Sequence, residues 1–445
     1  MKKVRFFLAI AILVVITMSK LHAQNPIVTG FADPAMRVFN GKMYMVVGRD
    51  KGPETKNFQM PYWSIISSSD LRNWKVECFI DPKDSYLGAG YMNCWAADIA
   101  FKNGKYYFYF SNGGNQTGVL VADKISGPFV DVLKKPMIEE SYSTNHEYDP
   151  TAFVDDDGQH YLTFGRDGQL KDELLHYQIA KLKDDMVSFD GKSKDLITTK
   201  PYGFGDKNRA RDHSYFHKYN GTYYLSCAGV YMSSKSIYGP FTNERKTGQN
   251  TGHASFSEYN GQTYHAWEWT CDPFNNRVYR QVMMTYLHYK DNGDMVDDMD
   301  FIQGSKYYAN GVGSYSAKWD TIEMEWYFKK SDKIVKKESP NGGFEIQNLT
   351  NGSEIYFPSV KDLSENSTIN FSLSSKSTGG KIEIYENSPT GKLLGTAIIP
   401  NTDSFTTYKT VAIKLANKAG TSDLCFVFKG SSNDLAHLDS FNFIK

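Results

Sequence analysis

Cysteine is scarce in this chain, and long apolar runs are almost absent. Only 5 of the 445 residues are cysteine, and no two of them form a CxxC pair. This spacing argues against a structural zinc site and against a scaffold held together by disulfides. We expect the five thiols to be mostly buried. After the N-terminal segment no run of 18 apolar residues occurs, so the remainder predicts no transmembrane helix.

An excess of charge of one sign is also missing. Lys and Arg together number 50, Asp and Glu together number 50, and the formal net charge is +0. A nucleic-acid partner would need a basic surface to bind phosphates, and no long Lys/Arg run follows the N-terminus. The balance therefore gives no support to nucleic-acid binding and is compatible with a neutral polyol such as a sugar.

The N-terminus carries the one strongly apolar segment. MKKVR is a short cationic region, FFLAIAILVVITM is an apolar run too short to span a bilayer comfortably, and KLHA ends at a small residue. This pattern predicts a signal peptide over residues 1–23, and hence an exported protein that is periplasmic or extracellular. The alternative is an N-terminal membrane anchor. No Cys follows the apolar run, which argues against a lipoprotein anchor.

One short phrase occurs five times. The copies are FNGKMYMVVG (39–48), NGKYYFYFS (103–111), DDGQHYLTFG (156–165), YNGTYYLSCA (219–228) and YNGQTYHAWE (259–268). An Asn-Gly or Asp-Gly pair before an aromatic run predicts a type I′ hairpin. Second strand pairs lie between the copies, with hardly any helical periodicity. The fold class is therefore all-β, with a five-bladed β-propeller over residues 24–328.

The composition changes after the last repeat. No tryptophan follows Trp326. Residues 329–342 are charged and then turn-rich, which is typical of a linker. Residues 343–445 alternate Ser/Thr-rich strands with turns, which predicts a β-sandwich, jelly-roll-like module.

Ionisable residues recur at one position relative to the repeated glycine. Asp33, Asp149, Asp212 and His253 precede it by eight or nine residues, and Asp98 precedes it by six. In a propeller the innermost strand of each blade begins at the axis, so we expect these groups to meet there. A lone Asp or His is often a turn former or a structural group. Several carboxylates crowded around one axis would repel each other, so we interpret the recurrence as a functional cluster.

Facing carboxyl groups are what cleavage of a glycosidic bond requires. An ionised group activates water and a protonated one donates to the leaving oxygen, and a separation of about 6.5–9.5 Å inverts the anomeric configuration. A third carboxylate can raise the pKa of the acid. Phe31, Trp95 and Trp267 lie near the same strand ends and can stack on sugar faces or pack between blades. For Trp267 we expect packing.

In the segments that carry these residues, the chain resembles glycoside hydrolase family 43, and the resemblance extends from about residue 25 to 325. The resembling segments are NPIVTGFADPAM, CWAADIAFKNGKYYFYFS, EYDPTAFVDDDGQHYLTFG and TGHASF. The resemblance implies an inverting glycosidase that acts mostly on arabinose- and xylose-containing plant polysaccharides, of the α-L-arabinofuranosidase or β-xylosidase type. It implies no required cofactor.

The resemblance also implies roles for single residues. Asp33 falls on the general base and Asp149 on the pKa-modulating Asp. His253 falls on a His that often sits beside a central metal ion or water, which makes it a candidate ligand for Ca²⁺ in the propeller channel. One His and solvent oxygens would be a sparse shell for that ion. The candidate substrate-binding residues are Phe31, Trp95, Asp98, His253 and Arg280.

The chain departs from the family at the general acid. The family has Glu at the head of the fourth-blade strand, where RDHSYFHKYNGTYYLS has Asp212. Asp is one methylene shorter, and a misplacement of roughly 1 Å can lower a rate by about 10²-fold. Three outcomes are open. Asp212 is the acid with adjusted geometry, which we favour; another carboxylate, such as Glu147 or Glu173, takes its place; or the propeller binds sugar without cutting it. A further hypothesis, a structural propeller that only contacts other proteins, predicts no sugar binding.

The C-terminal part resembles carbohydrate-binding module family 6 over about 343–445. The resembling stretches are KIEIYENSPTGKLLGTAIIPNTDSFTTYKTV and DLCFVFKGSSNDLAHLDSFNF. The main cleft of that family often has a Trp where this chain has Phe405 and an Asn where it has His437. Phe offers less area than Trp and no N–H donor. Sugar binding and a purely packing role both remain open for the module.

Overall fold

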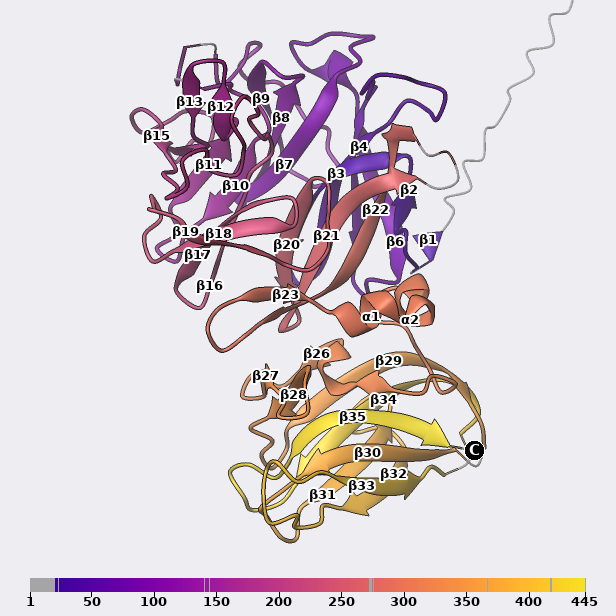
Figure 1. Cartoon of the computed structure of the whole chain (residues 1–445). Helices are drawn as coiled ribbons and strands as arrows, with labels where there is room; N and C mark the ends of the chain where they lie inside the picture. Colours follow the sequence, from indigo (N-terminus) through magenta and orange to yellow (C-terminus); the bar gives the residue numbers. More distant parts are fainter. Residues whose placement is uncertain are drawn as a thin grey trace, which may run out of the picture.

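The computed structural model describes residues 21–22, 24–139, 141–143, 145–271, 274, 276–365, 367–416 and 418–444. Most of the expected signal peptide lies outside these residues; the part described, β1 (Leu21–His22), pairs with β6. Five small sheets come first and a two-sheet sandwich follows (Figure 1). No helix among the described residues is long and apolar enough to cross a membrane.

Each of the first five sheets is one blade, and its innermost strand comes first. Blade I contains β3 (Phe31–Phe39), β4 (Lys42–Arg49), β5 (Trp63–Ser68) and β6 (Asn73–Ile80), and blade II contains β7 (Cys94–Lys102), β8 (Lys105–Asn112) and β9 (Gln116–Ala122). Blade III contains β10 (Thr151–Val154), β11 (His160–Phe164), β14 (Gln178–Lys181) and β15 (Lys194–Asp195), with the hairpin of β12 (Gly168–Leu170) and β13 (Glu173–Leu175) inserted.

The last two blades complete the ring. Blade IV contains β16 (Tyr215–Tyr219), β17 (Thr222–Cys227), β18 (Val230–Ser234) and β19 (Thr242–Lys246). Blade V contains β20 (Ala254–Tyr259), β21 (Gln262–Cys271) and β22 (Asn276–Tyr289), and its outermost strand is β2 (Val28–Thr29) from the start of the chain. The innermost strands contact one another in order, and β20 contacts β3. The prediction of a five-bladed propeller is confirmed.

The repeated Asn-Gly pairs form the turns between the first two strands of four blades. Both residues of each pair have positive φ, as a type I′ turn requires; in blade I, Asn40 has φ 50° and Gly41 has φ 69°. The blade III copy differs, because Gly158 closes a longer loop in which its amide donates to the Asp155 carbonyl oxygen at 2.9 Å. The expected hairpin forms there with a different turn.

Aromatic side chains fill the spaces between blades. Between blades I and II, Trp63 packs on Phe110 with ring centroids 5.1 Å apart, and both are fully buried. Burying a large apolar side chain stabilises the fold by about 1.5–3 kcal/mol. The five cysteines are free thiols, and four of them are buried while Cys78 is half-buried.

The sandwich consists of two antiparallel sheets. One sheet contains β29 (Glu354–Leu363), β34 (Gly420–Lys429), β31 (Lys381–Glu386) and β32 (Leu393–Ile398), and the other contains β28 (Phe344–Gln347), β35 (His437–Ile444), β30 (Thr368–Ser374) and β33 (Lys409–Lys414). Phe357, Phe371, Phe426 and Phe441 meet between them.

Earlier strands join both sheets, so the sandwich begins before residue 343. β24 (Tyr315–Ser316) and β26 (Lys329–Lys330) pair with β29, β25 (Ile322–Glu323) pairs with β35, and β27 (Val335–Glu338) pairs with β28. The segment 329–342, expected to be a linker, therefore contains β26 and β27 and is part of the module. Several of its charged residues, including Lys330, Lys336 and Lys337, line the cavity between the module and the propeller.

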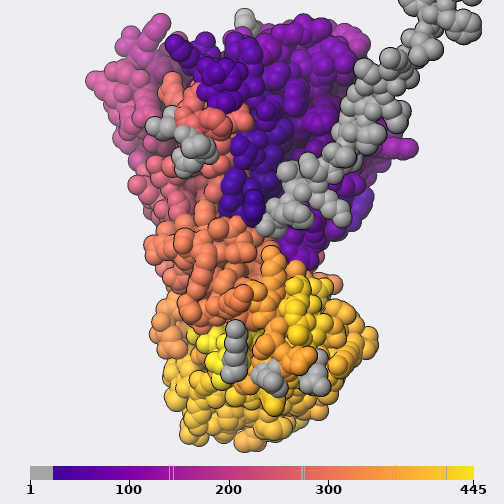
Figure 2. All heavy atoms as spheres, turned by 90° about the vertical axis from the view of Figure 1, so that its right-hand side faces the viewer, coloured from indigo at the N-terminus to yellow at the C-terminus, as the bar shows by residue number. Residues whose placement is uncertain are grey.

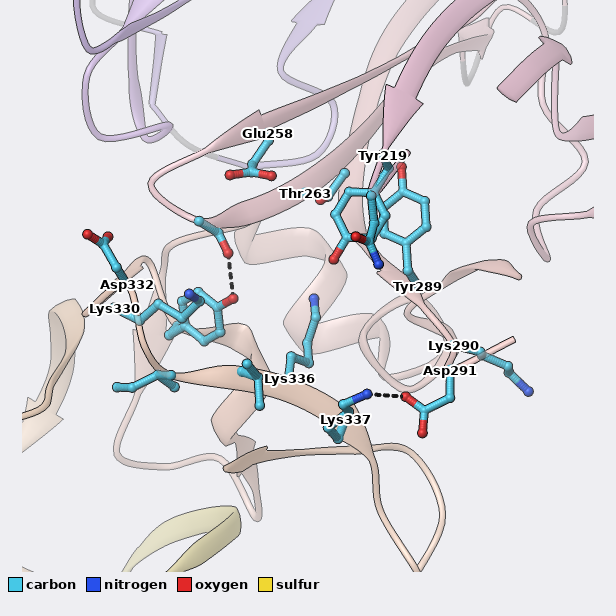
Figure 3. A pocket seen from close by; sticks show the side chains of 15 residues that line it. Tyr219, Glu258, Thr263, Tyr289, Lys290, Asp291, Lys330, Asp332, Lys336 and Lys337 are labelled. Carbon is cyan, nitrogen blue, oxygen red and sulfur yellow. Dashed lines mark hydrogen bonds and ion pairs between the residues drawn. The ribbon is translucent and has the colours of Figure 1, made fainter. Parts of the chain in front are cut away.

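The propeller and the sandwich are packed against each other. One continuous buried cluster contains Tyr286 of blade V, Trp326 and Phe357 of the sandwich, with α1 (Met299–Gln303) and α2 (Ser305–Asn310) at the junction (Figures 1 and 2). A cavity of about 380 Å³ lies between the blade IV and V turns and residues 327–337. Lys336 lies at its wall (Figure 3), and its Nζ donates to Gln262 Oε1 at 2.7 Å.

The carboxyl group of Glu325 is buried at this junction and forms no ion pair within the described part of the chain. Glu325 is 4% exposed, and its Oε2 has no hydrogen-bond partner among the described residues. Burial raises the pKa of Glu325 well above its ordinary value, the neighbouring Glu323 and Asp298 raise it further, and Lys336 opposes the shift. The folded protein therefore holds this group in its neutral form.

We predict that Glu325→Gln stabilises the protein selectively at alkaline pH. When folding raises the pKa of a carboxyl group, the protein becomes less stable as pH rises above 4.5, which is the pKa of that group in the unfolded chain. The reason is that the unfolded chain releases the proton at a lower pH than the folded protein does. The variant should melt about 2–4 °C higher than wild type at pH 8, with little difference at pH 4.5. Thermal melts at both pH values measure this; an equal difference at the two would contradict it.

Candidate active site

A cavity of about 320 Å³ opens where the innermost strands begin. It brings together residues that are far apart in the sequence and that come from all blades. Six of the residues singled out from the sequence line it: Asp33, Trp95, Asp149, Asp212, His253 and Arg280. The recurrence before the repeated glycines therefore does predict a spatial cluster.

The backbone at this end of the axis is unusual. Asp33, Asp149 and His213 have φ values of 55°, 56° and 53°. The left-handed region costs a non-glycine residue roughly 1–2 kcal/mol, and such strain concentrates at functional sites. In β3 the register also shifts between Ala32 and Ala35, so that Asp33 lies in a bulge. These local kinks turn the carboxyl groups into the cavity.

His253 lies between two of the carboxyl groups. Its Nδ1 is 2.7 Å from Asp33 Oδ1, and its Nε2 is 3.6 Å from Asp212 Oδ1. On its face it stacks on His213, with ring centroids 4.2 Å apart and an interplanar angle of 8°. Asp33 and Asp212 thus face each other across the width of one imidazole ring.

The charges of this group are mutually dependent. Burial alone would raise the pKa of Asp33, but Arg280 and His253 outweigh it and hold that pKa far below its ordinary range. For His253 burial acts in the opposite direction and would lower the pKa. Asp33, Glu268 and Asp212 outweigh burial and place the pKa of His253 well above 6.5. His253 is therefore an imidazolium ion, and Asp33 is a carboxylate at neutral pH.

The second pair of carboxyl groups is Asp149 and Asp212. Asp149 is 2% exposed, and its amide donates to Ser111 Oγ at 2.9 Å. Burial together with the nearby Asp212 and Asp33 raises the pKa of Asp149 to about 8, against the opposing charge of His253. The side chain of Asp212 is 42% exposed. Burial would raise the pKa of Asp212, but the close contact with the His253 ring and the charges of His253 and Arg166 lower it.

Two residues that the sequence did not indicate hold Asp212. The Tyr148 hydroxyl donates to Asp212 Oδ2 at 3.4 Å, and Arg166 Nη2 lies 3.9 Å from the same oxygen. Arg166 Nε in turn donates to the Tyr148 hydroxyl. Arg166 follows β11 and also lines the cavity, so its place depends on the blade III loop that the repeat pattern does not describe.

Glu268 is the carboxylate that sequence reasoning missed. It lies on β21, where it lines the cavity. Burial, with the charge of Asp33, raises the pKa of Glu268 to about 7, against the opposing charges of Arg280 and His253. A usable signal was present, because Glu268 stands as far after the blade V turn as His253 stands before it.

Asp98 and Phe31 do not line the cavity, contrary to expectation. Asp98 is 1% exposed and is bound by Arg37 and by the Ala152 amide. It precedes its glycine by six residues rather than eight or nine, so it lies further along the inner strand, inside the channel. The Arg49 guanidinium lies over the Phe31 ring, with Arg49 Cζ 5.0 Å from the ring centroid.

Other residues considered from the sequence also lie elsewhere. Trp267 is 3% exposed and packs on His265, as expected for a core residue. Neither Glu147, which is 4% exposed, nor Glu173, on the inserted strand β13, lines the cavity. Neither replaces Asp212 in this arrangement.

In the module, Phe405 and His437 lie together but do not form an open platform. Their rings stack with centroids 4.0 Å apart, so His437 covers one face of Phe405. His437 Nδ1 is 2.9 Å from Glu345 Oε1, and Nε2 is 3.0 Å from Asp434 Oδ2. These ion pairs hold the imidazole in place against one face of Phe405.

The comparisons with known proteins agree with this geometry. The family model "Glycosyl hydrolases family 43" matches residues 23–295, and "Carbohydrate binding module (family 6)" matches residues 323–445. The chain belongs to glycoside hydrolase family 43. Enzymes of this family are inverting glycosidases. The start of the module match also agrees with strands before residue 343 being part of the sandwich.

Individual relatives extend over both parts of this family 43 protein. An arabinoxylan arabinofuranohydrolase of Paenibacillus polymyxa is 29% identical over 93% of this chain and 72% of its own. A xylosidase/arabinosidase of Bacteroides ovatus is 29% identical over 60% of this chain and 94% of its own. A crystal structure of a family 43 arabinoxylan arabinofuranohydrolase from Bacillus subtilis, in complex with cellotetraose, has a TM-score of 0.54 at 24% identity, covering 96% and 99% of the two chains. It supports the fold.

The family also raises the question of a metal ion. Asp33, His253 and Glu268 form one group whose ligand atoms lie within 4.8 Å of one another, and Asp149, Asp212 and His253 form a second. Ca²⁺ prefers oxygen ligands, and a ligating His must be neutral. Here both nitrogens of His253 already face carboxylates, Nδ1 at 2.7 Å from Asp33 Oδ1 and Nε2 at 3.6 Å from Asp212 Oδ1. This arrangement does not fit a calcium ion bound through His253.

We predict that His253 remains protonated above neutral pH. Its two carboxylate neighbours stabilise the imidazolium form, so the ring should not titrate near 6.5. Nuclear magnetic resonance of ¹⁵N-labelled imidazole can follow this from pH 5 to 9, with Asp33→Asn as the comparison. The wild-type resonance should stay that of the cation to at least pH 8, and the variant should titrate lower. A wild-type midpoint at 6.5 would contradict the ion-pair arrangement.

Proposed function

We propose that this protein removes α-L-arabinofuranosyl or β-D-xylosyl groups from plant polysaccharides or oligosaccharides, with inversion. The observation that carries the proposal is that Asp33 and Asp212 face each other across His253, with a proton-retaining Asp149 beside Asp212. The names of the two relatives support arabinose and xylose as the sugars. The catalytic roles below are part of the same proposal.

Asp33 is the general base. The pairing with Arg280 and His253 keeps its carboxylate ionised, so that it can accept a proton from the attacking water. Family 43 enzymes invert, and inversion requires that water fits between base and substrate, on the opposite side from the acid. Asp33 is 3% exposed, so it meets only a water at the bottom of the cavity.

Asp212 is the general acid, and Asp149 retains the proton for it. Two carboxyl groups this close titrate as a pair rather than singly, and the pair still holds a proton near neutral pH because burial raises the pKa of Asp149 to about 8. Asp212 is the exposed member of the pair, so it is the one that reaches the leaving oxygen. Tyr148 and Arg166 fix its position.

The cavity suits one sugar residue. Its volume is about 320 Å³, near the lower end of the about 300–1,000 Å³ typical of ligand sites. Trp95 offers an aromatic face at the wall, held by a hydrogen bond of 3.0 Å from its Nε1 to the Phe58 carbonyl oxygen. Arg280 lies at the same wall, where its guanidinium donates to Asp50, Glu268 and Asp33. Removal of a single terminal or side-chain residue is therefore favoured.

A second candidate is a propeller that binds sugar without cutting it. The short Asp212 side chain favours this reading, as do the charges of His253 and Arg166, which lower the pKa of the group that must donate a proton. Tight calorimetric binding of an arabinoxylan oligosaccharide without release of any sugar would identify this function.

We also propose that the mature protein is exported after loss of residues 1–23. The cationic and apolar N-terminal segment supports this. N-terminal sequencing of protein secreted by the source cell should begin near Gln24, and an intact Met1 would contradict export by this route. Acid–base hydrolysis requires no cofactor, and the charged His253 speaks against Ca²⁺ as a requirement; activity should survive exhaustive chelation.

We predict that Asp33→Asn abolishes most of the hydrolysis. Asn preserves the size of the side chain but cannot accept the proton, and loss of general-base catalysis typically lowers a rate about 10²–10⁴-fold. Release of 4-nitrophenol from the arabinofuranoside and the xyloside measures this. A matched change outside the cavity, Asp291→Asn on the junction side, should leave the rate unchanged. Equal rates for wild type and Asp33→Asn would show that the base is another group.

We predict that Asp212→Glu retains or increases the rate, whereas Asp212→Ala loses about 10²-fold or more. The added methylene moves the donor roughly 1 Å toward the substrate, a distance that can matter about 10²-fold. The comparison uses a substrate with a poor leaving group, which depends most on the acid. If Asp212→Ala cleaves that substrate as fast as wild type, Asp212 is not the proton donor.

A further inference from the structure

Glu268 is the cavity carboxylate to which neither the repeat nor the family resemblance gives a role. It lies on β21, the second strand of blade V, and its side chain is 11% exposed. A carboxylate at this place is repelled by Asp33, so favourable contacts must offset the repulsion. Its contacts show what is gained.

The other blades that carry acidic groups have glycine at the corresponding position. The first two strands of each blade pair in a fixed register. When this register is extended past the last paired residues, toward the cavity, a glycine from the second-strand side lies across from the Asp. These pairs are Gly48 beside Asp33, Gly165 opposite Asp149 and Gly229 opposite Asp212. None of these glycines has room for a side chain: a Cβ at Gly48 would lie 2.1 Å from Met60 Cε, and one at Gly229 would lie 2.2 Å from the Gln249 carbonyl oxygen.

Blade V breaks this pattern. The same register places Glu268 opposite His253, and the Glu268 amide donates to the His253 carbonyl oxygen at 3.0 Å. Glycine at this position would leave the cavity wall open. The chain instead carries a long acidic side chain here, and it extends across the seam between blades V and I.

Glu268 binds the backbone of Asp33. Its Oε2 accepts the Asp33 amide at 3.0 Å. That amide belongs to a residue with a φ of 55° in a bulge of β3, where the regular ladder gives it no partner on β4. A charge-assisted hydrogen bond to a carboxylate is stronger than one between neutral groups. The strained backbone that aims the Asp33 carboxylate is therefore fixed by Glu268.

The same oxygen also fixes Arg280. Glu268 Oε2 accepts from Arg280 Nη1 at 2.9 Å, and Asp50 accepts from Nη2 at 2.8 Å on the other side. A guanidinium held on two sides has one orientation. In that orientation Nη1 lies 3.4 Å from Asp33 Oδ1, so Arg280 contacts the proposed base only while Glu268 and Asp50 hold it.

We propose that Glu268 is a positioning residue for the general base, which fixes the Asp33 backbone and the Arg280 guanidinium through one carboxylate oxygen. The inference rests on the proposed hydrolytic function. It requires an acceptor oxygen at residue 268 rather than a negative charge, and this requirement separates it from a purely electrostatic role.

Three variants test the proposal. Glu268→Gln keeps an acceptor oxygen, so its kcat should stay within about threefold of wild type. Glu268→Ala removes it, and kcat should fall about 10²-fold, as expected for a base displaced by roughly 1 Å, with KM changed less than kcat. Glu258→Ala, on the same blade and outside the cavity, should match wild type. Alanine within threefold of wild type, or glutamine as poor as alanine, would overturn the proposal.

Crystal structures of the Gln and Ala variants separate this inference from the proposed function. If wild type releases no pentose, the proposed function fails, but the structures still decide the role of Glu268. The Asp33 carboxylate should keep its position in Glu268→Gln and move by roughly 1 Å in Glu268→Ala. An unmoved Asp33 and Arg280 in the alanine variant would overturn the inference.

Discussion

The imidazolium of His253, held between Asp33 and Asp212, is the interaction on which the rest of the site depends. Four carboxyl groups line a cavity of about 320 Å³, an arrangement that repulsion would otherwise forbid. His253, Arg280 and Arg166 line the same cavity and supply positive charge. The pKa values of Asp33 and Asp212 are held below their ordinary range, whereas those of Asp149 and Glu268 are raised to about 8 and about 7. The proposed base Asp33 is therefore ionised, and the proton that the proposed acid Asp212 must deliver is held by its neighbour Asp149.

That ion pair lies at the seam where the propeller closes. Asp33 comes from the first blade and His253 from the last, and their distance of 2.7 Å depends on contact between β3 and β20. The N-terminal strand β2 completes blade V by pairing with β22, and the Met36 amide donates to Ser255 Oγ across the seam at 3.2 Å. Closure of the ring and assembly of the site are thus one event.

The sequence predicted the features that repeat and missed those that occur once. Five turn phrases were enough for the blades, and counting back from each glycine found Asp33, Asp149, Asp212 and His253. Asp98 was wrong as a cavity residue because a shift of two or three positions along an inner strand moves a side chain into the channel. Glu268 was missed because it lies on the second strand, where the other blades have glycine.

Long-range partners were beyond reach from sequence. The ion pair of His437 on β35 with Glu345 on β28, which holds the imidazole against Phe405, joins two strands that are far apart in the sequence. The strands before residue 343 have a linker-like composition, since edge strands with one exposed face are charged. Tyr148 and Arg166 hold Asp212 through a blade III loop that no repeat describes.

The most direct test of the account is the anomeric configuration of the sugar at the moment of its release. Proton magnetic resonance of the reaction, recorded before mutarotation, reports it. Because Asp33 and Asp212 lie on opposite sides of His253, we predict that the inverted anomer appears first: α-xylose from a β-xyloside, or β-arabinofuranose from an α-arabinofuranoside. First appearance of the retained anomer would contradict it, because it would require one of these carboxylates to bond to the sugar.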